Sequence, residues 1–249
     1  MNKNDLFAAV PSLCYVSSAN GGRQGIKTFV LRTAALSDRL INGVIDNFDR
    51  YALPFNPLNV SEKKIISFYE VFGNKNETVI EIGFGNGDAF LKTAKKNMDK
   101  NYLGFEVYLN GFASCITSAS EMGLSNVKLM RADVHEILEN CIENNSVSAF
   151  NIYFPDPWPK KKHHKRRLIN KEFVELLSQK LICGGTVHFA TDIEDYANEA
   201  LEILTSSPGL INKYSTFAPD NEGREHSVFE QKGILEGRTI YDIVVIKNP

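Results

Sequence analysis

Short apolar runs alternate with stretches of helical periodicity along most of the chain. The apolar runs cover residues 79–82, 102–107, 127–130, 149–154, 186–190 and 240–246. Runs without polar alternation are typical of strands that are buried on both faces. Helical spacing lies between them, at 89–97, 110–122, 134–141, 171–181 and 193–206. This alternation predicts an α/β fold in which helices cover both faces of a parallel sheet.

The first 60 residues lack this alternation. A short apolar patch near the N-terminus is interrupted by Pro11, and a stretch rich in Gly, Ser and Asn follows it. A helix is predicted at 37–49, and prolines then separate it from the main pattern. We therefore predict three parts, which are a flexible extension (1–27), a helical or arm segment (28–60) and one larger domain (61–249).

Composition narrows the class of protein. Of 249 residues, 43% are hydrophobic and the net charge is -2, which excludes disorder as the main state. No apolar stretch approaches the roughly 20 residues that span a bilayer, and the N-terminus is a poor secretory signal. Four well-separated cysteines without a neighbouring histidine predict neither a zinc site nor a disulfide framework. We expect a cytoplasmic protein without a metal.

The near-neutral total charge conceals one dense cationic segment. Six of the 28 basic residues lie within 160–167, which leaves 22 basic against 30 acidic residues elsewhere. An acidic body with one basic segment predicts local contact with a polyanion.

A glycine-rich turn follows the first predicted strand. Ligands of such sheets bind beyond the carboxyl ends of the strands, so this turn is a candidate site. Its glycines are Gly83, Gly85 and Gly87, and Asp88 stands where dinucleotide enzymes place their third glycine. Glu81 would repel a pyrophosphate but would suit the sulfonium and ammonium groups of S-adenosylmethionine. The alternative is a turn that closes strand and helix without any ligand.

Acids also follow the next two strands. Glu106 ends the second strand, where a carboxylate is placed to accept hydrogen bonds from ribose hydroxyls. Asp133 follows the third strand, where it would meet an adenine amino group. The alternative for either acid is a helix cap, and Asp133 fits that role well.

The fourth strand leads into a loop with three prolines around Asp156 and Trp158. Prolines fix their own φ angles and restrict the preceding residue, so the loop is stiff. The basic segment 160–167 follows directly and is placed to bind backbone phosphates while a pocket selects a base. A rigid turn with a solvated basic flank is the alternative. For Trp158, packing beneath the loop is favoured over stacking on a base.

These segments together resemble the bacterial tRNA (guanine-N(7))-methyltransferases. The resemblance is carried by 81–87, 104–107, 154–158 with the basic run to Arg167, and 190–192, and it extends from residue 28 to the C-terminus. It implies the Rossmann-like class I S-adenosylmethionine-dependent methyltransferase fold. That fold has three α/β/α layers and a mostly parallel seven-stranded sheet whose last strand is antiparallel.

The resemblance also implies an activity and residues for it. The activity is methyl transfer from S-adenosylmethionine to N7 of a guanine in the variable loop of tRNA, by a monomer or homodimer that needs no other protein. The donor would be bound by Glu81, Gly83, Glu106, Asp133 and Asp156, with Asp156 also catalytic. The substrate would be bound by Lys160, Asp192, Ser227 and Glu230.

This chain departs from the family pattern at two places. Ser227 replaces the threonine of a Thr-x-x-Glu motif but keeps the hydroxyl. The segment 233–238 lacks the His and Arg expected before its central glycine.

Guanine N7 carries a lone pair and no proton, so the attack on a sulfonium methyl needs no general base there. We expect Asp156 to stabilise the developing cation, and Asp192 and Glu230 to accept from N1–H and the exocyclic amine. Three other functions remain open. The first is a different S-adenosylmethionine-dependent methyltransferase, which would act on RNA in another way or on DNA, protein or a small molecule. The second is a nicotinamide oxidoreductase, and the third is a non-catalytic RNA-binding subunit.

Overall fold

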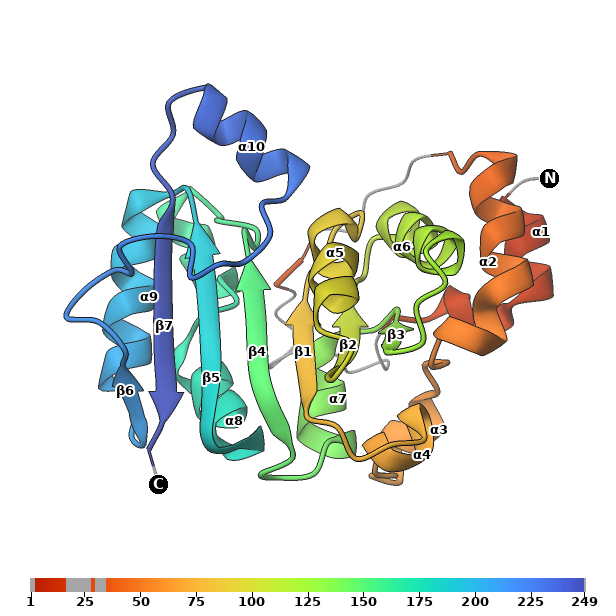
Figure 1. The fold of residues 1–249 in the computed structure, drawn as a ribbon, viewed down its shortest axis with the longest axis horizontal. Helices are drawn as coiled ribbons and strands as arrows, with labels where there is room; N and C mark the ends of the chain where they lie inside the picture. Colours follow the sequence, from red (N-terminus) through yellow and green to blue (C-terminus); the bar gives the residue numbers. More distant parts are fainter. Residues whose placement is uncertain (1–2, 17–27, 30–34, 249) are drawn as a thin grey trace.

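The computed structural model describes residues 3–16, 28–29 and 35–248. A seven-stranded sheet lies at their centre, in the order β3-β2-β1-β4-β5-β7-β6 (Figure 1). Neighbours among β1 to β5 are parallel, whereas β7 is antiparallel to both β5 and β6. The bounds are β1 (Thr78–Ile82), β2 (Asn101–Phe105), β3 (Val127–Met130), β4 (Val147–Tyr153), β5 (Leu181–Thr191), β6 (Leu210–Asn212) and β7 (Tyr241–Lys247). The predicted α/β fold with a mostly parallel seven-stranded sheet is confirmed.

Helices cover both faces of the sheet and complete three layers. Because successive strand residues point to opposite faces, Val79 packs with α2, α5 and α6, whereas Ile80 packs with α7, α8 and α9. The bounds are α2 (Asp38–Tyr51), α5 (Asp88–Lys96), α6 (Leu109–Glu121), α7 (Val134–Cys141), α8 (Lys171–Lys180) and α9 (Glu194–Ser206). None of the helices in the described part of the chain has the length and apolar character that crossing a bilayer requires.

The described N-terminal residues 3–16 pack against the body of the protein, and the division into an extension (1–27), an arm segment (28–60) and a domain (61–249) stays a prediction. Leu6, Val10 and Leu13 are buried in the cluster that contains α2. Their spacing of three to four residues places them on the side that faces the protein interior. Pro11 is the first residue of a short 3-10 helix, so the regular structure continues beyond it. The elements are α1 (Lys3–Ala9) and η1 (Pro11–Cys14). The rest of the predicted extension, 17–27, lies outside the described residues.

Five further elements were not predicted from the periodicity. Strand β6 has only three residues, which is too short for a pattern, and the apolar residues of α10 include four that are exposed. Helix α10 lies across the edge of the sheet toward which the arrowheads of β1 and β4 point (Figure 1). The helices concerned are α3 (Pro57–Ser61), α4 (Phe68–Phe72), η3 (Lys161–Arg166) and α10 (Val228–Leu235).

Candidate active site

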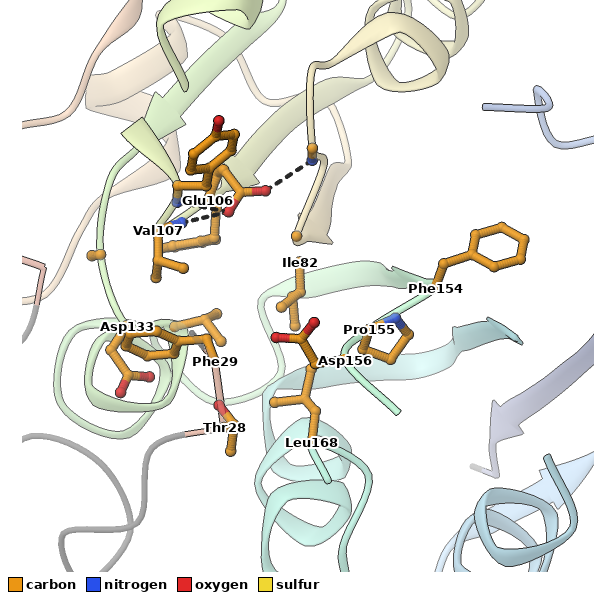
Figure 2. A pocket seen from close by; sticks show the side chains of 16 residues that line it. Thr28, Phe29, Ile82, Glu106, Val107, Asp133, Phe154, Pro155, Asp156 and Leu168 are labelled. Atoms are coloured by element: carbon orange, nitrogen blue, oxygen red, sulfur yellow. Dashed lines mark hydrogen bonds between the residues drawn. The ribbon is translucent and has the colours of Figure 1, made fainter. Parts of the chain in front are cut away.

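A cavity of about 270 Å³ opens at the carboxyl ends of β1 to β4. The loops after these strands supply its lining, together with Thr28 and Phe29 from the N-terminal region (Figure 2). Among the described residues that line it, three are acidic and none is Lys or Arg. The lining residues include Gly83, Gly85, Glu106, Asp133 and Asp156. The cavity therefore gathers most of the donor-site residues predicted from the sequence, and its acidic lining suits a cation rather than a pyrophosphate.

The glycine turn lies close to a neighbouring helix. Gly87 adopts a φ of 85°, and a Cβ placed there would lie 2.4 Å from Cys115 Sγ on α6. Any larger residue would push α5 away from α6 and change the shape of the turn. Asp88, at the position of the third dinucleotide glycine, accepts a hydrogen bond from the Val228 backbone N–H (3.1 Å). Asp88 thus joins the glycine turn to α10.

Glu106 is fixed by backbone N–H groups. Its Oε2 accepts from Gly85 N (2.9 Å), and its Oε1 accepts from Val107 N (2.7 Å) and Tyr108 N (2.9 Å) (Figure 2). Burial raises the pKa of this carboxyl, and these three amides oppose the rise. Because each carboxylate oxygen accepts up to two hydrogen bonds, Oε2 retains capacity for a ligand hydroxyl.

Asp133 has the helix-cap role that the sequence left open, and it also lies at the cavity. Its side chain caps α7 by accepting from His135 N (3.1 Å), and the residue also lines the cavity. Its backbone N–H donates to the Val16 carbonyl, so the N-terminal region is attached to this loop. Arg131 Nη1 adds a second attachment by donating to the Leu13 carbonyl (2.5 Å).

Glu81 lies outside the cavity lining. It is 5% exposed, on β1 between Gly104 of β2 and Asn151 of β4. Burial raises its pKa to about 8, although a hydrogen bond with Asn151 and the charge of Arg224 oppose that rise. A buried carboxyl with a raised pKa is a group that a nearby cation would stabilise in its charged form.

The loop after β4 holds Asp156 between two strained aromatic residues. Phe154 (φ 51°) and Trp158 (φ 45°) both have left-handed backbone, which is rare for bulky side chains and is often found at functional sites. Phe154 N donates to the Ala190 carbonyl (2.8 Å) and Trp158 Nε1 donates to the Thr28 carbonyl (3.1 Å). These bonds hold the loop so that Asp156 lines the cavity. Trp158 is engaged within the protein by this bond.

The basic segment has two kinds of cation. Arg167 is 1% exposed, donates to the Pro157 carbonyl (2.9 Å) and pairs with Asp195 and Glu199 of α9. It therefore anchors the loop to the body of the protein. The other five basic residues of 160–167 include exposed lysines, and Lys160 is one of these.

The two carboxylates expected to contact the base both pair with arginine. Asp192, after β5, pairs with Arg238, whose side chain is 31% exposed. Glu230, on α10, is fully buried and accepts two hydrogen bonds from Arg224 (2.5 and 2.6 Å). Ser227 Oγ caps α10 by accepting from Glu230 N (3.1 Å). Ser227 and Glu230 thus also match a capping-box sequence. From the sequence these two residues were assigned to a substrate motif, and this helix cap was not considered.

Arg224 is the centre of a buried ionic network that sequence analysis missed. It donates from Nε (2.8 Å) and Nη2 (3.0 Å) to Asp242 of β7, which also bonds His188 Nε2 of β5 (2.7 Å). Burial would raise the pKa of Asp242, but these two partners hold it below its usual range. Arg224 also stacks over Tyr153 (5.1 Å). Its distance in sequence from Asp242 left no local signal for this pairing.

The described residues contain no cluster of three or more His, Cys, Asp or Glu side chains placed to bind a metal ion. They do fit a cationic cosubstrate, because the cavity is acidic and the carboxyl of Glu81 is buried beside it with a raised pKa.

Comparisons with known proteins show which family the chain resembles. A family model described as "Putative methyltransferase" matches residues 75–243. The chain is 40% identical over 228 residues to a "tRNA (guanine-N(7)-)-methyltransferase" of Histophilus somni (strain 2336), which covers 91% of this chain and 88% of the relative. A relative with the same name from Francisella philomiragia is 39% identical over 222 residues, which covers 89% of this chain and 95% of the relative.

Solved structures share the fold. A 16S rRNA methyltransferase, KamB, superposes with a TM-score of 0.55 at 12% identity and covers 79% of this chain and 96% of that one. An antibiotic-related methyltransferase superposes with a TM-score of 0.50 at 19% identity and covers 75% and 98%. At these identities the likeness supports the fold alone.

Proposed function

The chain belongs to the family of tRNA (guanine-N(7)-)-methyltransferases, which are S-adenosylmethionine-dependent transferases, and we propose on this basis the role of each site residue in the reaction. The enzyme transfers a methyl group from S-adenosylmethionine to N7 of a guanine in tRNA. Glu106 and Asp133 bind the adenosine part of the donor, with Gly83 and Gly85 allowing close approach of the backbone. Glu81 supplies negative charge beneath the cationic end.

When bound, S-adenosylmethionine supplies a methyl group on a positively charged sulfur. The N7 lone pair forms the new N–C bond as the S–C bond breaks, so the positive charge moves from sulfur to the purine ring and no proton has to leave N7. The chain's main task is therefore alignment of the two reactants. The strained loop holds Asp156 at the cavity. There its carboxylate accepts a hydrogen bond from the base or from S-adenosylmethionine and stabilises the positive charge that develops on the purine.

On the substrate side, Lys160 contacts a phosphate and Asp192 accepts from the guanine edge. Glu230 and Ser227 were expected to contact the base as well. Because the Glu230 carboxylate is fully buried with Arg224, we propose that both act by holding α10 in position.

The position of Asp156 is the observation that most strongly supports this function. It lines the acidic cavity, and the basic segment begins four residues later in the same loop. A reacting base and the phosphates beside it would thus contact one continuous stretch of chain. This placement favours a methyltransferase over a nicotinamide enzyme or a non-catalytic RNA-binding subunit.

The test is transfer of labelled methyl from S-adenosylmethionine to unmodified tRNA, followed by reduction and aniline cleavage, which cut at 7-methylguanine. We expect a single cut in the variable loop. Label at another base would contradict the guanine specificity. Donor binding without any transfer would favour the non-catalytic alternative.

We further propose that the enzyme acts in the cytoplasm as a monomer or homodimer without another protein subunit. The purified chain alone should then methylate tRNA, and sedimentation velocity should give its mass. Activity that needs an added cell fraction would contradict this proposal.

A further inference from the structure

Arg238 occupies a slot between α10 and the loop after β5. Its guanidinium lies over the Phe229 ring, 4.9 Å from the centroid, while its Nη1 donates to Asp192. Its Nη2 lies 3.4 Å from Glu236 Oε2. Its Nε is buried and donates to none of the described residues. One planar cation thus has an aromatic ring on its face and a carboxylate at its edge, yet one of its donors is unsatisfied.

The slot is shaped by a glycine inside a helix. Gly233 follows Phe229 by one turn of α10, so both lie on the same face. A Cβ at Gly233 would lie 2.9 Å from Arg238 Cζ and would fill the slot. Glycine inside a helix costs stability relative to alanine, so its presence here indicates a need for space.

The slot opens beside the donor cavity. The Phe229 side of α10 contacts Phe154, with ring centroids 5.5 Å apart, and Phe154 lines the cavity. Phe229 remains 52% exposed. Figure 2 shows the Phe154 ring directed away from Asp156, and therefore not filling the space in front of that carboxylate. A planar group in the slot would have the methyl-donor cavity at its side.

A guanidinium and the edge of guanine have the same donor pattern. The guanidinium of arginine is planar and presents adjacent parallel N–H donors. Guanine presents N1–H and its exocyclic amine in the same way, on a flat ring that stacks on aromatic side chains. The two therefore satisfy the same combination of aromatic face and carboxylate.

We propose that Phe229, Gly233 and Asp192 form the slot that receives the target guanine, and that Arg238 occupies it until tRNA displaces it. The proposal rests on the proposed function and adds to it the residues that hold the base. Phe229 stacks on the purine, Asp192 accepts from its edge, and Gly233 leaves room for its thickness. Arg238 is an intramolecular competitor, and its side chain, which is only partly buried, can leave the slot.

The test compares kcat and KM for unmodified tRNA, S-adenosylmethionine affinity by calorimetry, and the thermal unfolding midpoint. Phe229→Ala should lower kcat/KM about 5- to 150-fold, the range for loss of one base–aromatic stack, and Phe229→Tyr should restore most of it. Gly233→Ala should lower kcat/KM at least about tenfold without lowering the midpoint, because alanine favours the helix and Arg238 can swing away. Donor affinity should stay at the wild-type value in all three variants.

Arg238→Lys keeps the charge but loses the planar donors, so it should raise kcat/KM for tRNA about two- to fivefold, the range that corresponds to one cation–π contact at an exposed site. Leu235→Ala is the matched control, because Leu235 lies on the same helix and is 87% exposed. It should behave as wild type. A kcat/KM for Arg238→Lys at or below the wild-type value would overturn the role of Arg238 as competitor.

Failure of the slot and failure of the proposed function give different results. If wild type makes 7-methylguanine and both Phe229→Ala and Gly233→Ala make it equally fast, the slot is wrong and the function stands. If wild type labels a base other than guanine, the proposed function fails, and the slot fails with it.

Discussion

The two sides of the active site hold their acidic residues in different ways. On the donor side, Glu106 and Asp133 accept hydrogen bonds from backbone N–H groups. On the acceptor side, Glu230 and Asp192 are paired with Arg224 and Arg238. Most of these backbone donors lie one or two residues after the carboxylate that they bind, and Gly85 of the neighbouring glycine turn is the exception. The arginine partners are charged side chains that lie 6 residues (Arg224 to Glu230) and 46 residues (Arg238 to Asp192) away.

This difference shows what local sequence can and cannot reveal. A carboxylate bound by its own loop keeps a lone pair toward the cavity, so its position indicates its function. A carboxylate paired with an arginine side chain is neutralised by a partner that no local pattern identifies, whether that partner is near in sequence, as Arg224 is to Glu230, or far, as Arg238 is from Asp192. The acceptor side is therefore where substitutions should most change stability, and the donor side is where they should most change chemistry.

The largest effect is expected from breaking the buried acceptor-side network. Arg224→Met leaves the carboxylates of Glu230 and Asp242 buried without their cation. Removing one partner of a buried pair costs about 3–5 kcal/mol, which urea unfolding would measure. A cost below about 1 kcal/mol would show that water replaces the guanidinium and that the network does not hold α10.

The next effect is on chemistry. Asp156→Ala should lower kcat about 10²–10³-fold, the range for loss of one preorganised electrostatic group. Donor affinity, measured by calorimetry, should change far less. Asp156→Asn keeps the shape of the side chain but removes its charge, so it separates the effect of the charge on kcat from the effect of packing. Equal losses in kcat and donor affinity would make Asp156 a binding residue only.

An effect that is smaller for each unit of pH is expected at Glu81. Because its folded pKa is raised to about 8 from an unfolded value of about 4.3, the folded state favours the protonated form. Its contribution to stability is complete below the unfolded pKa and is lost as pH rises toward the folded pKa. Relative to Glu81→Gln, wild type should lose up to about 1.4 kcal/mol per pH unit in this interval. Parallel stability curves for the two proteins would contradict the raised pKa.

The smallest effect on stability is expected in the exposed part of the basic segment. Lys161→Ala should change the unfolding free energy by less than about 0.5 kcal/mol, because Lys161 is exposed. It should reduce the salt dependence of tRNA affinity by about one unit of log–log slope. An unchanged slope would show that Lys161 does not contact a phosphate.

Much of the donor side could be predicted from sequence because its signals are local. Buried strands followed directly by Gly83 and Glu106 indicate both the fold and the edge of the sheet where a ligand would bind. Arg167 was counted with the exposed cations, since sequence does not show that Asp195 and Glu199 face it from α9. Helix α10 was missed because exposed apolar residues such as Phe229 and Leu235 disturb its periodicity. Pairings over long sequence distances are decided by the fold and not by neighbouring residues.

The position of β7 between β5 and β6 has a consequence for how the protein is made. The ribosome adds residues from the N-terminus, and β7 (Tyr241–Lys247) follows the other six strands in sequence. The sheet between β5 and β6 therefore cannot close until β7 has been made. Asp242, which orders Arg224 and through it Glu230, arrives with this strand. A nascent chain thus builds the strands around its cavity before it can complete the ionic network of Arg224, Glu230 and Asp242.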